Sequence, residues 1–328
     1  MSGAPAKYDR AGLGNALGAH VVWGSMPLYL QLVKTVPAVE YVAWRILFTI
    51  PLCLLFVAWR RSWTELRAVL RDRRTMLTLL ASSMLIGVNW FLYVWAIQTG
   101  HVYAASLGYY ILPLTMMLLG LVFLGERLTR RQWAAVGLAG LGVAALAAGA
   151  MTTLWLSLAM ATTFGVYGLL RKTVQAGPLV GLTLESAILA PLSLALAWWY
   201  AASPAGSALT QDPLTTFAVV MGGPMTAIPL IMFAFAARRL PYTVVGFLQF
   251  SSPTIVFLLG LLVFGEELKP AQLACFVAIA RLSHSVVMAP AASAATPRPA
   301  SPTAAHCSRV RRSPRKTRPS SIMVSGRM

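Results

Sequence analysis

The chain has 328 residues, of which 58% are hydrophobic and only 11% are charged, and its mean hydropathy is +0.69. This balance excludes a water-soluble globular domain and predicts a protein of the lipid bilayer. The net charge of +18 would by itself suggest nucleic acid, but no nucleic-acid partner is expected, because the basic residues divide between short loops and the C-terminal tail.

Ten stretches of the chain are long and apolar enough to cross a bilayer as helices. About 20 residues, each rising about 1.5 Å, cover a hydrocarbon core of roughly 30 Å. In chain order the stretches are residues 11–33, 38–59, 75–97, 102–124, 132–150, 152–170, 179–200, 214–236, 243–264 and 271–289. The first has no small-residue cleavage site after a short apolar core, so we expect it to remain as a helix and not to be removed as a signal peptide.

Lysine and arginine residues fall in alternate connections between these spans, and such residues are retained on the cytoplasmic side of a membrane. The basic connections contain Lys7 and Arg10; Arg60, Arg61, Arg67, Arg71, Arg73 and Arg74; Arg127, Arg130 and Arg131; Arg171 and Lys172; and Arg238 and Arg239. The opposite connections contain only Lys34 and Lys269. We therefore predict an all-α membrane protein with ten transmembrane helices and cytoplasmic N and C termini, lying as a multi-pass protein in the inner (plasma) membrane.

The chain contains an internal repeat. The segment PLTMMLLGLVFLGERL at 113–128 returns about 140 residues later as PTIVFLLGLLVFGEEL at 253–268. Because about five spans separate the two copies, the second must cross the bilayer in the opposite direction, as in many secondary transporters. We predict a first five-helix repeat at 1–150, a second, inverted one at 151–289, and a disordered basic tail at 290–328.

Two ionisable residues lie well inside predicted spans, at equivalent positions of the two repeats: Arg45 and Glu185. Such residues cost roughly 2.5–3.5 kcal/mol on insertion scales, so they normally face protein or water. Inverted symmetry places the two at different depths, so we expect both to line one central cavity, on either side of a substrate; a purely structural role is the alternative. Glu185 and Glu40 are candidates for proton coupling, although Glu40, in the first turn after Pro37, also suits the helix dipole.

The third span carries a polar face. Ser82, Ile86, Asn89 and Tyr93 lie on one side of a helix, with Trp90 beside them. A face that carries an amide should look into the bundle, where Asn and Tyr can bond a ligand and aromatic rings can stack on it. Hydrogen bonding between helices is the alternative role.

The fourth and ninth spans combine polar groups with a proline. Tyr109 and Tyr110 precede Pro113 in the fourth span, and Gln249 precedes Pro253 in the ninth. We predict that the polar side chains contribute to the cavity wall. The prolines are expected to kink their helices, either as hinges or for packing alone.

No enzyme activity, cofactor or metal is predicted. The 4 histidines lack metal-ligand spacing, and neither a nucleophile elbow nor a phosphate-binding loop occurs. An intramembrane enzyme acting on lipid would need clustered acids or histidines, whereas the carboxylates here are isolated. A non-transporting assembly or receptor subunit is the remaining alternative, and whether the chain is a monomer or a homodimer stays open.

The chain contains the runs WGSMPLYLQLVKTVPAVEYVAWRILF, IGVNWFLYVWAIQTGHVYAASLGYYILPL, GLVFLGERL and GFLQFSSPTIVFLLGLLVFGEEL. They give it a resemblance to RarD-type members of the EamA group, within the drug/metabolite transporter superfamily. It covers residues 12–269 and implies a ten-helix inner-membrane permease for a small organic metabolite or a drug-like solute; some members are named for chloramphenicol sensitivity. The positions that match recurrent family features are Glu40, Arg45, Asn89, Trp90, Glu185 and Gln249.

We expect transport by alternating access, either coupled to protons or as facilitated diffusion, in which the two halves rock about the cavity. The resemblance stops before the predicted tenth span, where Arg281 and His284 interrupt a stretch that the family would continue as apolar. A changed reading frame near Ala280 is our hypothesis for this composition.

Overall fold

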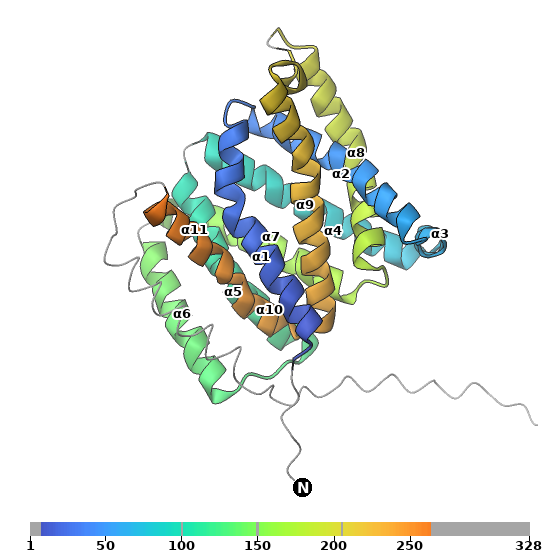
Figure 1. Cartoon of the computed structure of the whole chain (residues 1–328). Coiled ribbons are helices and arrows are strands. Elements are labelled where there is room, and N and C mark those ends of the chain that lie inside the picture. The colour runs from blue at the N-terminus through green and yellow to red at the C-terminus, as the bar shows by residue number, and fades with distance from the viewer. Residues whose placement is uncertain (1–7, 100, 149–150, 205, 264–328) are drawn as a thin grey trace, which may run out of the picture. The chain divides into compact units, whose positions relative to one another are not determined.

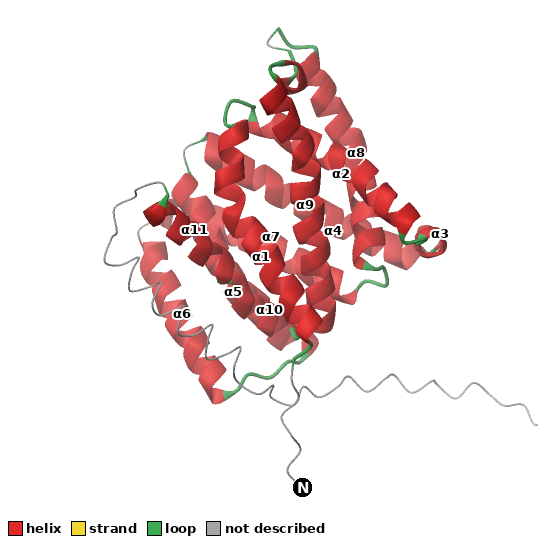
Figure 2. Cartoon of the chain, in the orientation of Figure 1, coloured by secondary structure: helices red, strands yellow, loops and turns green. Residues whose placement is uncertain are grey.

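The computed structural model of the chain describes residues 8–99, 101–148, 151–204 and 206–263. Within these ranges every regular element is a helix (Figures 1 and 2). Six of the described helices are long and apolar enough to cross a membrane. The predicted tenth span, the end of the second repeat motif, the reading-frame hypothesis and the basic tail all fall outside the described residues.

The predicted spans that lie in the described part of the chain are helices, with bounds within a few residues of the prediction. In order, the elements are α1 (Arg10–Leu30), η1 (Gln31–Val33), α2 (Ala38–Trp59), α3 (Trp63–Arg71), α4 (Arg73–Gln98), α5 (Val102–Leu124), α6 (Arg130–Ala148), η2 (Met151–Thr153), α7 (Leu154–Thr173), α8 (Pro178–Ala201), η3 (Ala208–Thr210), α9 (Pro213–Arg239), α10 (Tyr242–Gln249) and α11 (Ser251–Leu262). The ninth span is therefore divided between α10 and α11.

Short polar signals set the helix ends. The Asp9 side chain accepts hydrogen bonds from the first amides of α1, and Asp212 does the same for α9. Pro178 and Pro213 occupy the first turns of α8 and α9, where the missing N–H has no intrahelical partner in any case. At the end of α5, Gly125 adopts φ 63°, the left-handed conformation that favours glycine.

The basic connections predicted from the sequence meet at one end of the bundle, which we call the basic end. Lys172 of α7 donates to the carbonyls of Ala237 and Leu240 at the end of α9, at 2.7 and 2.5 Å. In return, Arg238 of α9 donates to Val174 and Ala176 after α7, at 2.7 and 2.9 Å. Each cation thus caps the carbonyl end of the other's helix.

Acidic side chains complete the basic end. The Glu126 carboxylate, after α5, accepts the Tyr242 and Thr243 amides of α10 at 2.6 and 2.8 Å, and Glu65 of α3 accepts the Gly177 amide at 2.7 Å. Asp9 pairs with Arg239 at 3.1 Å, and the hydrogen bond from that guanidinium lowers the pKa of the Asp9 carboxyl. These contacts hold the connections around α3, α5–α6, α7–α8 and α9–α10 together.

Close packing of α2 on α9 depends on two adjacent glycines. A Cβ on Gly223 would lie 2.6 Å from the carbonyl carbon and oxygen of Phe48, and one on Gly222 would lie 3.1 Å from the Arg45 Cβ. The backbones approach so closely that the Thr49 hydroxyl donates to the Gly223 carbonyl at 3.3 Å. Small residues serve this purpose at helix interfaces in membranes.

We expect Gly223→Ala to separate α2 from α9 and lower the melting temperature of the detergent-purified protein, by an amount equivalent to roughly 1–3 kcal/mol, because the methyl group meets backbone atoms that have no room to move. Gly14→Ala is the matched control, since no heavy atom lies within 4 Å of a Cβ placed there. Equal melting temperatures for the two variants would contradict this account.

Candidate functional site

A buried ion pair joins α7 to α8 at the position predicted from Glu185. The Glu185 Oε1 lies 3.8 Å from the Arg171 Nε, and both side chains are 1% exposed. Ser82 of α4 donates its hydroxyl to the same carboxylate oxygen, and the Tyr167 hydroxyl lies 3.5 Å from the other one. Three helices thus contribute to the surroundings of one carboxylate.

The Arg171 guanidinium is only partly bonded. Its Nη2 donates to the Pro178 carbonyl at 3.0 Å, while Nε and Nη1 have no hydrogen-bond partner among the described residues. Space for the group comes from Gly181, where a Cβ would collide with Nη1 and lie 2.6 Å from the central guanidinium carbon. The site therefore needs a glycine one turn before Glu185.

Arg171 is the member of this site that sequence reasoning missed. The sequence predicted it to be one of the basic residues of the loops, whereas it lies in the last turn of α7 and is completely buried. The available signal was Gly181, four residues before Glu185 and hence on the same helical face. Tyr167, whose hydroxyl lies near the same carboxylate, was likewise not among the predicted site residues.

Arg45, the other predicted charge, lies apart from this pair. Its guanidinium carbon is 4.3 Å from the centroid of the Trp90 ring on α4 and 6.0 Å from that of Tyr41. Arg45 makes no ion pair with a described residue, and its buried Nε has no hydrogen-bond partner among them. The structure thus brings Arg45 to Trp90 but not to Glu185.

The predicted inward face of α4 is buried, with Ser82, Ile86 and Asn89 each at most 4% exposed. Asn89 donates its amide to the Met160 carbonyl at 2.8 Å and to the Thr163 hydroxyl at 3.1 Å, both on α7. These bonds fit the alternative role of joining helices.

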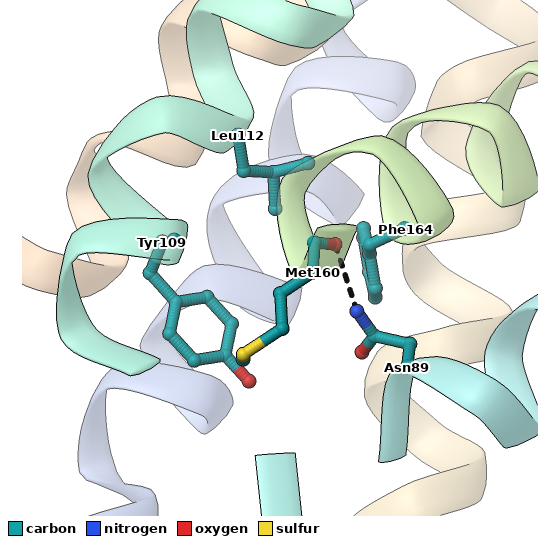
Figure 3. A pocket seen from close by; sticks show the side chains of 6 residues that line it. Asn89, Tyr109, Leu112, Met160 and Phe164 are labelled. Atoms are coloured by element: carbon teal, nitrogen blue, oxygen red, sulfur yellow. Dashed lines mark hydrogen bonds between the residues drawn. The ribbon is translucent and has the colours of Figure 1, made fainter. Parts of the chain in front are cut away.

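A small pocket lies beside Asn89. Figure 3 shows Tyr109 of α5 beside the Met160 side chain, facing Asn89. The pocket is also lined by Gly108, Leu112 and Phe164, and it leaves no space for a water molecule. In this conformation it is a packing contact.

Two of the three tyrosines predicted for the site, Tyr93 and Tyr109, contact each other. The rings of Tyr93 and Tyr109 make an edge-to-face contact with centroids 6.0 Å apart, and Tyr109 is 37% exposed. Tyr110, the neighbouring candidate, instead packs partly buried against the apolar core.

The helix containing Pro253 is interrupted, whereas the one containing Pro113 is not. α10 ends at Gln249 and α11 begins at Ser251, while α5 continues through Pro113. Pro253 has no N–H to bond the Gln249 carbonyl four residues earlier, which explains the end of α10. Gln249 itself is 3% exposed, and its side-chain oxygen has no partner among the described residues.

Glu40 has three structural partners at the end opposite the basic one. Its Oε1 accepts hydrogen bonds from Trp44 Nε1 at 3.1 Å, from the Ser207 hydroxyl at 3.1 Å and from the Ala208 amide at 2.8 Å. The carboxylate thereby fixes the α8–α9 connection to the start of α2, which favours the structural reading of this residue.

An apolar groove of about 130 Å³ opens between α2, α4 and α8. Trp90 and Ile46 contribute to its walls, together with Val94, Leu189 and Ser193; neither Arg45 nor Glu185 does. No cluster of three or more metal-ligating side chains occurs within the described ranges.

Comparisons with known proteins identify the family. Residues 10–148 match the EamA-like transporter family. The chain is 41% identical to an uncharacterised transporter of Pseudomonas aeruginosa over 82% of its own length and 91% of that protein. It is 39% identical to the protein RarD of Streptomyces exfoliatus, covering 82% and 85% of the two chains. The chain is a RarD-type member of the EamA-like transporter family.

The fold of this EamA-like transporter also occurs among solved structures. A crystal structure of a protein at 19% identity superposes with a TM-score of 0.69, over 86% of this chain and 98% of the other. At that identity the likeness concerns the fold alone. The chain is thus a multi-pass membrane transporter of the drug/metabolite type.

Replacing Arg171 with Met should lower the thermal stability of the transporter in detergent by the equivalent of about 3–5 kcal/mol, because the Glu185 charge loses its partner inside the protein. Combining Arg171→Met with Glu185→Gln should recover most of that loss, since no uncompensated charge remains. A double variant no more stable than the single one would show that the two charges do not depend on each other.

Proposed function

We propose that this EamA-like transporter is a secondary permease that moves a small organic solute, a metabolite or a drug-like molecule, across the inner membrane by alternating access. The observation that carries the proposal is the buried Arg171–Glu185 pair, with Ser82 and Tyr167 at its carboxylate, inside a bundle of apolar helices. Ionisable groups in such places normally serve the path of a substrate or a proton.

The packing of the helices supports two inverted five-helix repeats. With the offset of the sequence repeat, α1 corresponds to α7, α2 to α8 and α4 to α9. The contacts follow the same correspondence: α1 packs on α9 as α7 packs on α4, and α2 packs on α9 as α8 packs on α4. Two halves related in this way can exchange conformations, which would open the protein to one side and then to the other.

The orientation rests on the basic end. Its concentration of arginines and lysines favours a cytoplasmic location, and α1 starts there, which agrees with a cytoplasmic N terminus. The connection between α8 and α9, which Glu40 holds at the opposite end, would then face the other side of the membrane.

A membrane-impermeant thiol reagent added outside intact cells should label a cysteine placed at Ser203, in the α8–α9 connection, but not one placed at Arg61, in the turn after α2. Both variants belong in a background without the 3 native cysteines. Labelling of both positions from the same side would rule out the proposed topology.

Proton coupling is proposed for Glu185. Its carboxylate can exchange the Arg171 guanidinium for a proton if a conformational change separates α7 from α8 locally, and the Ser82 hydroxyl can bond either form. Glu40 is not given this role, because three donors from α2 and the α8–α9 connection already hold one of its oxygens.

Uptake by purified protein in liposomes tests the function. We expect at least one organic solute in a screen of metabolites and drugs to enter faster than into empty liposomes, and an imposed pH gradient to accelerate that uptake. Glu185→Gln should remove the acceleration, because the amide cannot exchange a proton. Glu40→Gln, the matched control, should keep it.

All rates should be compared at equal amounts of folded protein. The Arg171→Met and Glu185→Gln double variant restores charge balance but not the exchangeable proton, so it should also fail to respond to the gradient. A folded protein that moves no solute in the screen would favour the non-transporting alternative, and an unchanged gradient response in Glu185→Gln would remove Glu185 from coupling.

A further inference from the structure

Three other cations of the bundle, Arg171, Lys172 and Arg238, have acceptors among the described residues, whereas Arg45 forms no ion pair with any of these residues. Arg171 reaches Glu185 and the Pro178 carbonyl, and Lys172 and Arg238 each reach two backbone carbonyls. The buried Nε of Arg45 donates no hydrogen bond to any described residue. A guanidinium carries five N–H donors and stays charged, so this one has unused capacity for an anion.

The residues around Arg45 hold its guanidinium in place without accepting a hydrogen bond from its Nε. Its contact with the Trp90 ring is a cation–π interaction at 4.3 Å, which uses the face of the ring and none of the N–H hydrogen bonds. Close packing of α2 against Gly222 fixes the start of the side chain. The guanidinium is therefore held in place, while its Nε–H makes no hydrogen bond to a described residue.

The groups around the guanidinium also determine what would fit beside it. The Tyr41 ring centroid lies 6.0 Å from the guanidinium carbon, and the Tyr41 hydroxyl is buried without a described partner. Tyr93, three residues after Trp90 on α4, makes an edge-to-face pair of rings with Tyr109. No described carboxylate pairs with Arg45, because Glu185 is engaged by Arg171 and Glu40 by the α8–α9 connection. A cation bordered by aromatic rings and hydroxyl donors, without a protein counter-charge, suits an oxyanion attached to an aromatic or other apolar body.

We propose that Arg45 is the binding group for an anionic solute, with its planar donors on a carboxylate or phosphate oxyanion and the rings of Trp90, Tyr93 and Tyr109 beside the rest of the molecule. This deepens the proposed function and rests on it: the cargo is an organic anion. Glu185 and Arg171, in a separate cluster, would serve coupling and not recognition.

The test uses benzoate as the probe and benzamide as its neutral counterpart, with detergent-purified protein at neutral pH. We expect benzoate to raise the melting temperature and benzamide at the same concentration to have no such effect. Arg45→Gln should weaken the apparent benzoate affinity about tenfold or more, since a charge-assisted hydrogen bond is lost. Arg60→Gln, which removes an exposed arginine at the basic end, should leave the affinity unchanged.

Lipid phosphate is the other source of such an anion. To test this source, phosphatidylglycerol is added to one sample of the detergent-purified protein, and phosphatidylcholine is added to another as the control. Stabilisation by phosphatidylglycerol that depends on Arg45, without any by benzoate, would overturn the solute assignment. Equal effects of benzoate and benzamide on the unmodified protein would overturn it as well, and this comparison needs no variant to fold.

The outcome separates the two proposals. Liposome uptake of neutral or cationic solutes only, unaffected by benzoate, would refute the anion site and leave the transport function standing. Arg45-dependent binding of benzoate by a protein that transports nothing would refute the transport function and leave the anion site standing. Inhibition of uptake by benzoate, without inhibition by benzamide, would support both proposals.

Discussion

The last carbonyls and first amides of a helix have no partner within that helix, so other parts of the protein or water must bond them. At the basic end long charged side chains do so: Lys172 and Arg238 bond the carbonyl ends of each other's helices, and Glu126 bonds the amide end of α10. The residues that a topology rule counts as loop charges are thus the ones that hold the helices together.

The sequence predicted the helices well because length and apolar composition decide them locally. α2 and α5 coincide with the predicted spans at both ends, and the inward face of α4 followed from helical spacing. The partner of Glu185 could not be predicted in this way, because Arg171 stands beside Lys172 and reads as a second loop charge. Only the three-dimensional packing shows that one of the two neighbours points into the bundle and the other across to α9.

Equivalence in a repeat and contact in space are different relations, as Arg45 and Glu185 show. The internal repeat placed them at matching positions, and a substrate between them was a natural expectation. In the structure each belongs to its own cluster, Arg45 with Trp90 on α4 and Glu185 with Arg171 on α7. This separation allows recognition of a solute and exchange of a proton to be assigned to different residues.

The short helix α10 belongs to the second half of the chain and is bonded to the first half. Its amide end is bonded by Glu126 of the first half, all eight of its residues are buried, and its other end is released from α11 at Phe250 because Pro253 supplies no hydrogen bond. After this break α11 packs on α1, where the Ser252 hydroxyl donates to the His20 carbonyl at 3.2 Å and Ile255 lies against Gly24. The proline thus divides the predicted ninth span into two helices with different partners, α10 bonded by Glu126 at the basic end and α11 packed on α1.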